Sequence, residues 1–537
     1  MSVRFEKRAG ERHTAIGVLG AVLTVLVLGL AGCTSPGSGA RATPDASVFA
    51  HVNDGWLRGT VSQGAREFLG VPYAAPPVHD LRFAPPQPAR PWHGVRSATA
   101  QGPACVQFQP MGVRPGQATS EDCLYLDIYT PSHVRRGDSL PVLFWIHGGN
   151  FTQGSAVLYG GQRFASLTNS VFVSINYRLG PYGFLALPEL AAASPLGSGN
   201  YGLLDQIAAL KWVRSNIAAF GGDARDITID GQSAGSGAVC DLLASPLAAG
   251  LFQRGILESG PCTDIAPTSL PDAEGTGSEF AAAAGCGQPK SVVACLRNAR
   301  TPAIDAAQQQ DAIDTPVYGT PVLPVAPAQA IASGHWNKVP LIIGSVRSEG
   351  KLFIIAQASM TAAQYTYAIE SRYGASAAAV LARYPAHDYP APFYALAAVI
   401  TDATYTCDSY SSASQFAAQV PTWEEEFDDP TSPTLYGWQP RGIDMSNAHS
   451  AELAYLWNFT LGERPLTPAE LRLGARLDRY WAAFARTANP NVPGQVAWPR
   501  VTAASHPVID FHPTGDTVST TVFSAEHQCR FWATVHG

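Results

Sequence analysis

The pentapeptide Gly231-Gln232-Ser233-Ala234-Gly235, a G-x-S-x-G pattern, is the feature that most limits the possible folds of this chain. Residues 227–230 before it alternate and are β-branched, which predicts a short strand. Residues 236–244 after it are small and apolar, which predicts a buried helix. A sharp strand-to-helix turn at a serine is a nucleophile elbow, in which glycines leave room for the strained turn. We therefore expect Ser233 to present a reactive hydroxyl at the top of a sheet.

Short apolar runs recur along the chain, with helical patterns between them. The runs lie at residues 141–146, 171–177, 227–230, 255–258 and 341–344. Their length and composition predict strands buried on both faces of a parallel sheet. The clearest helical pattern, over residues 202–216, spaces Leu203, Ile207 and Leu210 by three or four. Alternating strands and helices predict a doubly wound α/β architecture.

The composition supports a large folded domain and disfavours several functions. Of the 537 residues, 46% are hydrophobic and 14% are charged, so the chain can bury a large core. The net charge is −7 and no basic stripe is present, which disfavours nucleic acid as a partner. The absence of a C-x-x-C pair from the sequence disfavours zinc, and we expect neither a metal nor another cofactor.

Residues 422–429 (TWEEEFDD) form an acidic stretch. Their carboxylates lack the spacing of a calcium-binding loop. In a strand, the side chains of Glu424, Glu426 and Asp428 would share one face. We expect this face to contact solvent rather than a metal ion.

The N-terminus has the features of a targeting segment. A basic start precedes an apolar stretch at residues 15–32, which ends in Leu30-Ala31-Gly32-Cys33. We interpret residues 1–32 as a signal peptide with a lipobox ending at Cys33, the expected site of lipidation. The alternatives are an uncleaved membrane anchor and a signal peptide cut elsewhere. Residues 33–48 are expected to be a flexible tether, and residues 49–537 to form the catalytic domain.

This interpretation places the folded part of the chain outside the cytoplasm. We expect it in the cell envelope, held at the outer face of the plasma membrane by a lipid anchor only, or secreted. The cysteines agree with an oxidising compartment, because eight of the nine remain once Cys33 is set aside. Their spacing alone does not choose how these eight pair.

A reactive serine needs a base that takes its proton and a carboxylate that orients the base. After an elbow of this kind, the acid and then the histidine follow the serine in the chain. Spacing does not choose among the histidines that follow Ser233, which are His335, His387, His449, His506, His512, His527 and His536. Glu349 is a favoured acid because it follows the run at 341–344, with Asp311, Asp314 and Asp402 as rivals.

A glycine-rich loop follows the first apolar run. Residues 145–151 (WIHGGNF) match the H-G-G-type loop of lipases and esterases, whose backbone N–H groups bind a developing oxyanion. Ala234, the residue after the serine, would supply a further N–H group.

Longer motifs resemble those of the type B carboxylesterases, the family that includes the cholinesterases. The matching segments are EDCLYLDI at 121–128, NYRLG at 176–180, GGD at 221–223, LFQRGILESG at 251–260 and FARTANP at 484–490. The resemblance extends from about residue 52 to the C-terminus and suggests a secreted or lipid-anchored bacterial member. It implies the α/β-hydrolase fold, a large central and mostly parallel sheet with helices on both faces. Helical insertions, here expected at residues 351–405, would form the pocket wall.

The resemblance also assigns site residues. It implies a Ser-His-Glu triad of Ser233, His449 and Glu349, because Glu349 falls on the family's E-G position and His449 on its H-x-x-E-L position. The implied oxyanion donors are the backbone amides of Gly149, Asn150 and Ala234. The implied disulfides are Cys105–Cys123, Cys286–Cys295 and Cys407–Cys529. Cys240 and Cys262 have no family pair, so a bond between them and two buried thiols remain open.

Three departures from the family pattern bear on specificity. Asn150 replaces the third glycine of the H-G-G-type loop, and its side chain should narrow the pocket beside the acyl group. Gln232 stands where the family usually has a glutamate, which removes a charge that would favour a cationic transition state. The segment between Cys105 and Cys123 contains no tryptophan, and quaternary ammonium is held by aromatic faces, so a choline ester is an unexpected substrate.

We therefore expect a serine hydrolase that cleaves small or medium carboxylic esters through an acyl-enzyme intermediate. One alternative is a lipase or amidase that acts on cell-envelope substrates. Another is a non-catalytic, cholinesterase-like binding ectodomain, because function does not follow from fold. The sequence makes no prediction of oligomeric state.

Overall fold

The computed structural model describes residues 48–535 except 109–112, 115, 136, 263–266, 288–290, 436–439, 458 and 460–463. The predicted signal peptide at 1–32, Cys33 and the tether up to residue 47 lie outside the described residues. The candidate base His536 lies outside them as well.

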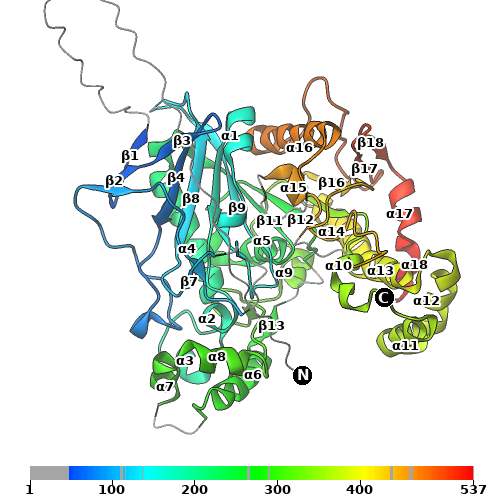
Figure 1. Cartoon of the computed structure of the whole chain (residues 1–537), viewed down its shortest axis with the longest axis horizontal. Helices are drawn as coiled ribbons and strands as arrows, with labels where there is room; N and C mark the ends of the chain where they lie inside the picture. Colours follow the sequence, from blue (N-terminus) through cyan, green and yellow to red (C-terminus); the bar gives the residue numbers. More distant parts are fainter. Residues whose placement is uncertain are drawn as a thin grey trace, which may run out of the picture. The chain divides into compact units, whose positions relative to one another are not determined.

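A large sheet organises the described part of the chain, in which eleven strands are joined edge to edge (Figure 1). From one edge to the other they are β18 (Thr517–Ser519), β17 (Val508–Phe511), β16 (Thr422–Phe427), β15 (Leu341–Val346), β12 (Arg254–Glu258), β11 (Gly222–Gln232), β9 (Leu140–Ile146), β10 (Val171–Ile175), β8 (Tyr125–Pro131), β4 (Ala65–Pro72) and β3 (Thr60–Ser62). The strands from β17 to β10 are parallel. Antiparallel strands flank them at both ends, β18 on one side and β8, β4 and β3 on the other.

The five predicted apolar runs are all strands of this parallel region. Their boundaries differ slightly from the expectation, because β10 ends at Ile175 and β11 begins at Gly222. The mostly parallel sheet with helices around it confirms the expected α/β-hydrolase fold.

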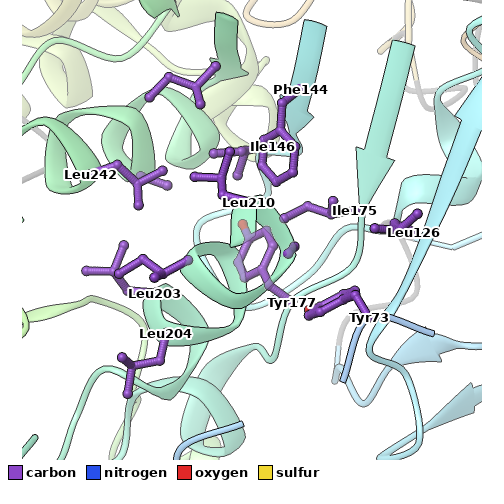
Figure 2. Close-up of a cluster of buried hydrophobic side chains, with 14 of the residues drawn as sticks. Tyr73, Leu126, Phe144, Ile146, Ile175, Tyr177, Leu203, Leu204, Leu210 and Leu242 are labelled. Carbon is purple, nitrogen blue, oxygen red and sulfur yellow. The ribbon is translucent and has the colours of Figure 1, made fainter. Parts of the chain in front are cut away.

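Alternate residues of the central strands face two separate apolar cores. Val142, Phe144 and Ile146 of β9 belong to the core that includes α4 (Tyr201–Asn216) and α5 (Ala234–Ala244). Figure 2 shows part of this core, with Leu203 and Leu210 of α4 near the strand residues. Leu143 and Trp145 belong to the other core, which is built by α1 (Gln162–Thr168), α15 (Leu453–Leu456) and α16 (Pro468–Thr487). Helices thus cover both faces, as burial of a parallel sheet requires.

Two helical insertions leave the sheet at the carboxyl ends of its strands. The first, between β12 and β15, contains α6 (Leu270–Ala283), α7 (Val292–Asn298), α8 (Thr301–Gln308) and α9 (Pro327–Ser333). The second, between β15 and β16, contains α10 (Gly350–Phe353), α11 (Ala362–Tyr373), α12 (Ala377–Arg383), α13 (Pro392–Ile400), the π-helical turn η10 (Thr401–Thr406) and α14 (Cys407–Ala417). The second insertion has its own apolar core, which it shares with α18 (Cys529–Val535).

Apart from single 3₁₀-helical turns, the remaining elements are short helices and strands. They are α2 (Gly180–Phe184), α3 (Pro188–Ala191), α17 (Val522–Glu526), a small sheet of β1 (Phe49–Val52), β2 (Gly55–Arg58) and β5 (Val95–Ser97), and the strand pairs β6 (Ala104–Cys105) with β7 (Thr119–Ser120) and β13 (Thr268–Ser269) with β14 (Val317–Tyr318).

The acidic stretch at 422–427 is a strand, but the expectation of a solvated face is wrong. All residues of β16 are buried. Glu424 pairs with His506, and Glu426 pairs with His527 at 2.7 Å and with Arg347 at 3.0 Å. Basic side chains distant in the sequence thus compensate the buried charges, which the strand's own alternation cannot reveal.

Four disulfides join the eight cysteines of the described residues. They are Cys105–Cys123, Cys240–Cys262, Cys286–Cys295 and Cys407–Cys529. Such bonds persist in oxidising compartments, so they indicate an exported protein. Among the described residues, no helix is both long and apolar enough to span a bilayer.

Candidate active site

Ser233 occupies the sharp turn between β11 and α5. Its backbone has φ 57° and ψ −126°, a strained conformation for a residue with a side chain. The turn is possible because the residues two positions before and after Ser233 are glycines: a Cβ on Gly235 would lie 2.1 Å from the carbonyl oxygen of Ile146. The Ser233 side chain makes no cap to α5, and the residue is partly exposed. This geometry is that of a nucleophile elbow.

The glycine-rich loop after β9 lies directly against the serine. A Cβ on Gly148 would be only 3.0 Å from Cβ of Ser233. The loop continues through Gly149 and Asn150 with positive φ values of 108° and 53°. Within the described part of the chain, the backbone N–H groups of Gly149, Asn150 and Ala234 donate no hydrogen bond. They are therefore available to a ligand beside Ser233.

Contacts of His147 with Tyr177 fix the start of this loop. Its ring stacks on Tyr177 with centroids 4.5 Å apart, and the Tyr177 hydroxyl donates to the His147 carbonyl at 2.8 Å. Burial lowers the pKa of His147 to about 4, which keeps its ring neutral. A neutral, stacked side chain fixes the loop without adding charge near Ser233.

Glu349 and His449 are in direct contact. Nδ1 of His449 lies 2.5 Å from Oε2 of Glu349, and both side chains are almost fully buried. The other carboxylate oxygen of Glu349 accepts the backbone N–H of Val346 at 2.9 Å. The turn after β15 and the loop before α15 are tied together, because Ser348 N–H donates to the carbonyl of Asn447 at 3.0 Å.

The opposite ring nitrogen of His449 faces the elbow. Its Nε2 lies 3.3 Å from Nε2 of Gln232, the residue directly before Ser233. The structure thus brings Glu349 and His449 together beside Gln232, the residue that precedes Ser233. The sequence marks Gln232 only as a departure from the family pattern, and it does not predict the contact with His449.

The rival acids and histidines lie in other arrangements. His527 sits between Asp402 at 2.6 Å and Glu426 at 2.7 Å, and His506 pairs with Glu424. Asp314 contacts Asn150. Among the described residues, the side chain of Asp311 forms no hydrogen bond or ion pair. His335, His387 and His512 are at least partly exposed. Among the described candidates, the pair Glu349 and His449 is the one that adjoins the elbow.

Aromatic side chains of the second insertion flank His449. Phe353 and Tyr405 stack on each other with centroids 5.2 Å apart, and their centroids lie 4.8 Å and 5.3 Å from that of His449. Phe353 remains 47% exposed, so it offers apolar surface beside the imidazole. Tyr405 belongs to the π-helical turn η10, a type of helical defect that is frequent at functional sites.

Buried carboxyl groups lie behind the triad positions. Glu258 of β12 and Glu425 of β16 are in register on either side of Gly344, where a Cβ would lie 2.0 Å from Oε1 of Glu425. Burial raises the pKa of both far above the usual value. Burial and then the charge of Glu349 raise the pKa of Glu452 to about 8. These raised pKa values favour the neutral form of the three acids. Among the described residues, no group of His, Cys, Asp or Glu is arranged to hold a metal ion.

Comparison with known proteins agrees with the fold and the elbow. Residues 45–532 match the model of the carboxylesterase family. The para-nitrobenzyl esterase of Bacillus subtilis is 34% identical, over 83% of this chain and 91% of its own length. The cocaine esterase of Oryctolagus cuniculus is 33% identical, over 84% of this chain and 90% of its own. The liver carboxylesterase B-1 of Rattus norvegicus is 33% identical, over 82% of this chain and 85% of its own. The chain therefore belongs to the carboxylesterase family and is a carboxylic ester hydrolase.

Proposed function

We propose that this enzyme hydrolyses small or medium carboxylic esters by acyl transfer through Ser233. The observation that carries the proposal is the environment of His449. Nδ1 of its ring contacts the buried carboxylate of Glu349, while Nε2 faces the residue beside the serine. An imidazole held in this way can take a proton at Nε2 and return it.

The proposed reaction has two steps around one intermediate. Oγ of Ser233 attacks the ester carbonyl carbon while Nε2 of His449 accepts its proton. Glu349 holds Nδ1–H and stabilises the imidazolium that forms. His449 then protonates the departing alcohol, which leaves an acyl group on Ser233. Water, activated by the same imidazole, releases the acid and restores the serine.

The negative charge of each tetrahedral intermediate needs donors close to the serine. We assign this role to the backbone amides of Gly149, Asn150 and Ala234, which are free of other partners among the described residues. Donors fixed before the reaction begins stabilise the oxyanion without reorganisation, and one such donor contributes about 3 kcal/mol.

A fluorophosphonate probe tests the nucleophile. The enzyme should react with one equivalent and lose activity on 4-nitrophenyl butyrate, and mass spectrometry should find the label on Ser233. The Ser233→Ala variant should stay unlabelled, while the surface variant Ser215→Ala should label normally. A label on another serine, or an unreactive wild-type protein, would contradict the proposal. The second result is also what a binding ectodomain would give.

We also propose that the exported enzyme is lipid-anchored through Cys33. The lipobox at residues 30–33 and the four disulfides of the folded domain support this proposal. In a bacterial host, radiolabelled palmitate should enter the full-length protein and not its Cys33→Ala variant. Release of unlabelled enzyme into the medium would instead indicate ordinary secretion.

A further inference from the structure

A carboxylate lies beside the oxyanion loop. Oδ2 of Asp314 is 3.5 Å from Nδ2 of Asn150, and the backbone amide of the same Asn150 is a proposed oxyanion donor. Asn150 has φ 53° and is exposed, whereas Asp314 is half-buried. The side chain that replaces the family's third loop glycine thus links the oxyanion loop to an acidic group from another segment of the chain.

The segment that carries Asp314 is held firmly. The Gln308 side chain bonds both the N–H and the carbonyl of Ile313, at 3.0 Å and 3.1 Å. On the other side, Thr315 Oγ1 bonds Thr268 Oγ1 at 2.8 Å, and the Pro316 carbonyl accepts the N–H of Thr268 at 2.9 Å. The residues before and after Asp314 are therefore fixed, and its position beside Asn150 is part of the fold.

Asp314 has no cationic partner in the part of the chain that the structure describes. It forms no ion pair there with Lys, Arg or His, and Asn150 is its side-chain partner. Burial raises its pKa, and the hydrogen bond from Asn150 opposes this shift. An uncompensated anion near forming negative charge works against the transition state of a neutral ester. The same anion would stabilise a substrate that brings a positive charge.

We propose that Asp314 selects esters that carry a protonated amine on the acyl or the alcohol chain. This specificity rests on the proposed function, since it concerns the same Ser233 reaction. A protonated amine has an N–H group that can donate to the Asp314 carboxylate, whereas quaternary ammonium has none. An ammonium ion bound there would supply the missing counter-charge, so that the carboxylate would no longer repel the oxyanion.

Isosteric ester pairs test this specificity on the wild-type enzyme. The first pair, 4-nitrophenyl 6-aminohexanoate and 4-nitrophenyl heptanoate, differs by an ammonium on the acyl side. The second, 2-(dimethylamino)ethyl butyrate and 3-methylbutyl butyrate, differs by an ammonium on the alcohol side. In at least one pair, kcat/KM should be about 10-fold higher for the cationic ester, as expected for a hydrogen bond between charged groups. The preference should shrink at high ionic strength.

The variant Asp314→Asn should invert the effect of charge. Its kcat/KM should fall about 10-fold on the preferred cationic ester and rise on the neutral one, because the anion no longer opposes the oxyanion. A poorly folded protein would lose both activities together. Asp311→Asn, which removes an acid three residues earlier in the same segment, should leave the ratio unchanged.

The outcomes separate the two proposals. Hydrolysis of the neutral esters with no preference for either cationic ester would overturn the role of Asp314 and leave the proposed function intact. An unchanged ratio in Asp314→Asn would do the same. Failure to hydrolyse any of the four esters would overturn both the proposed function and this specificity.

Discussion

Gln232 donates a hydrogen bond from its side-chain Nε2 to Nε2 of His449 across 3.3 Å. An amide nitrogen is a donor only, so Nε2 of the ring must be the acceptor. The ring proton is then on Nδ1, where it faces Glu349 at 2.5 Å. This is the tautomer in which Nε2 can take the proton of a serine hydroxyl.

The variant Gln232→Glu should make the enzyme more sensitive to acid. A carboxylate beside Nε2 favours the imidazolium, which cannot act as a base. We expect the acid limb of the kcat/KM profile to move to higher pH by roughly one unit. Gln232→Met, which removes the donor without adding charge, is the control and should keep the wild-type midpoint. Identical profiles for all three proteins would show that residue 232 does not act on His449.

Lys351 joins the two loops that carry the acid and the histidine. It lies two residues after Glu349, and its Nζ donates to the carbonyl of Ser446 at 2.7 Å and pairs with Asp444 at 3.1 Å. Lys351→Met should let the His449 loop move. Since small displacements of catalytic groups slow the chemical step, kcat should fall about 10-fold with little change in KM. The control variant Lys338→Met, at an exposed site, should keep the wild-type kcat and KM. A change in KM alone would contradict a positioning role for Lys351.

His527 should stabilise the fold as a buried cation. Burial alone would lower the pKa of His527, but Glu426 and Asp402 outweigh it and raise the pKa to about 10. The stabilisation should be complete below the unfolded value near 6.5 and should disappear as the pH rises through 10. Among the described residues, His527→Gln leaves Asp402 without a cation and Glu426 with Arg347 alone, so it should cost about 3–5 kcal/mol at neutral pH.

Urea unfolding at several pH values checks this prediction. The cost of His527→Gln should shrink towards pH 10, and His387→Gln, at an exposed site, should cost little. A cost that does not depend on pH would mean that His527 acts by packing rather than by charge.

Glu452 should stabilise the fold as a buried neutral acid, and this stabilisation, like that from His527, should be lost as the pH rises. Its pKa of about 8 lies above the unfolded value near 4.5, so the folded protein holds a proton that the unfolded chain releases. The free energy of unfolding should therefore fall as the pH rises from about 5 through 8, by an amount on the order of a few kcal/mol. Glu452→Gln should flatten this dependence, whereas the exposed Glu279→Gln should not. An equally steep decline in Glu452→Gln would contradict the assignment.

The elbow and the parallel strands could be predicted because their signals are local. Strand burial on both faces shows directly as apolar runs, and the turn at Ser233 requires glycine at fixed positions beside it. The carboxylates of β16 could not be placed in this way. Their partners His506 and His527 lie 82 and 101 positions away from Glu424 and Glu426. The strand pattern therefore suggests exposed carboxylates, whereas the fold buries them in a network of ion pairs.

Other parts of the site depend on three-dimensional proximity in the same way. Spacing left seven histidines open as the base, and the resemblance to a family was needed to favour His449. The bond between Cys240 and Cys262 had no family precedent and follows from the nearness of α5 to the segment after β12. The sequence makes Asp314 a rival acid, and its contact with Asn150 could only be seen in the folded chain.

The kcat of Ser233→Ala on 4-nitrophenyl butyrate shows whether the Ser233 hydroxyl is the nucleophile. With the fold verified by thermal unfolding, we expect kcat to fall at least ~10³-fold. Turnover close to that of the wild-type enzyme would show that the hydroxyl at residue 233 is not the nucleophile.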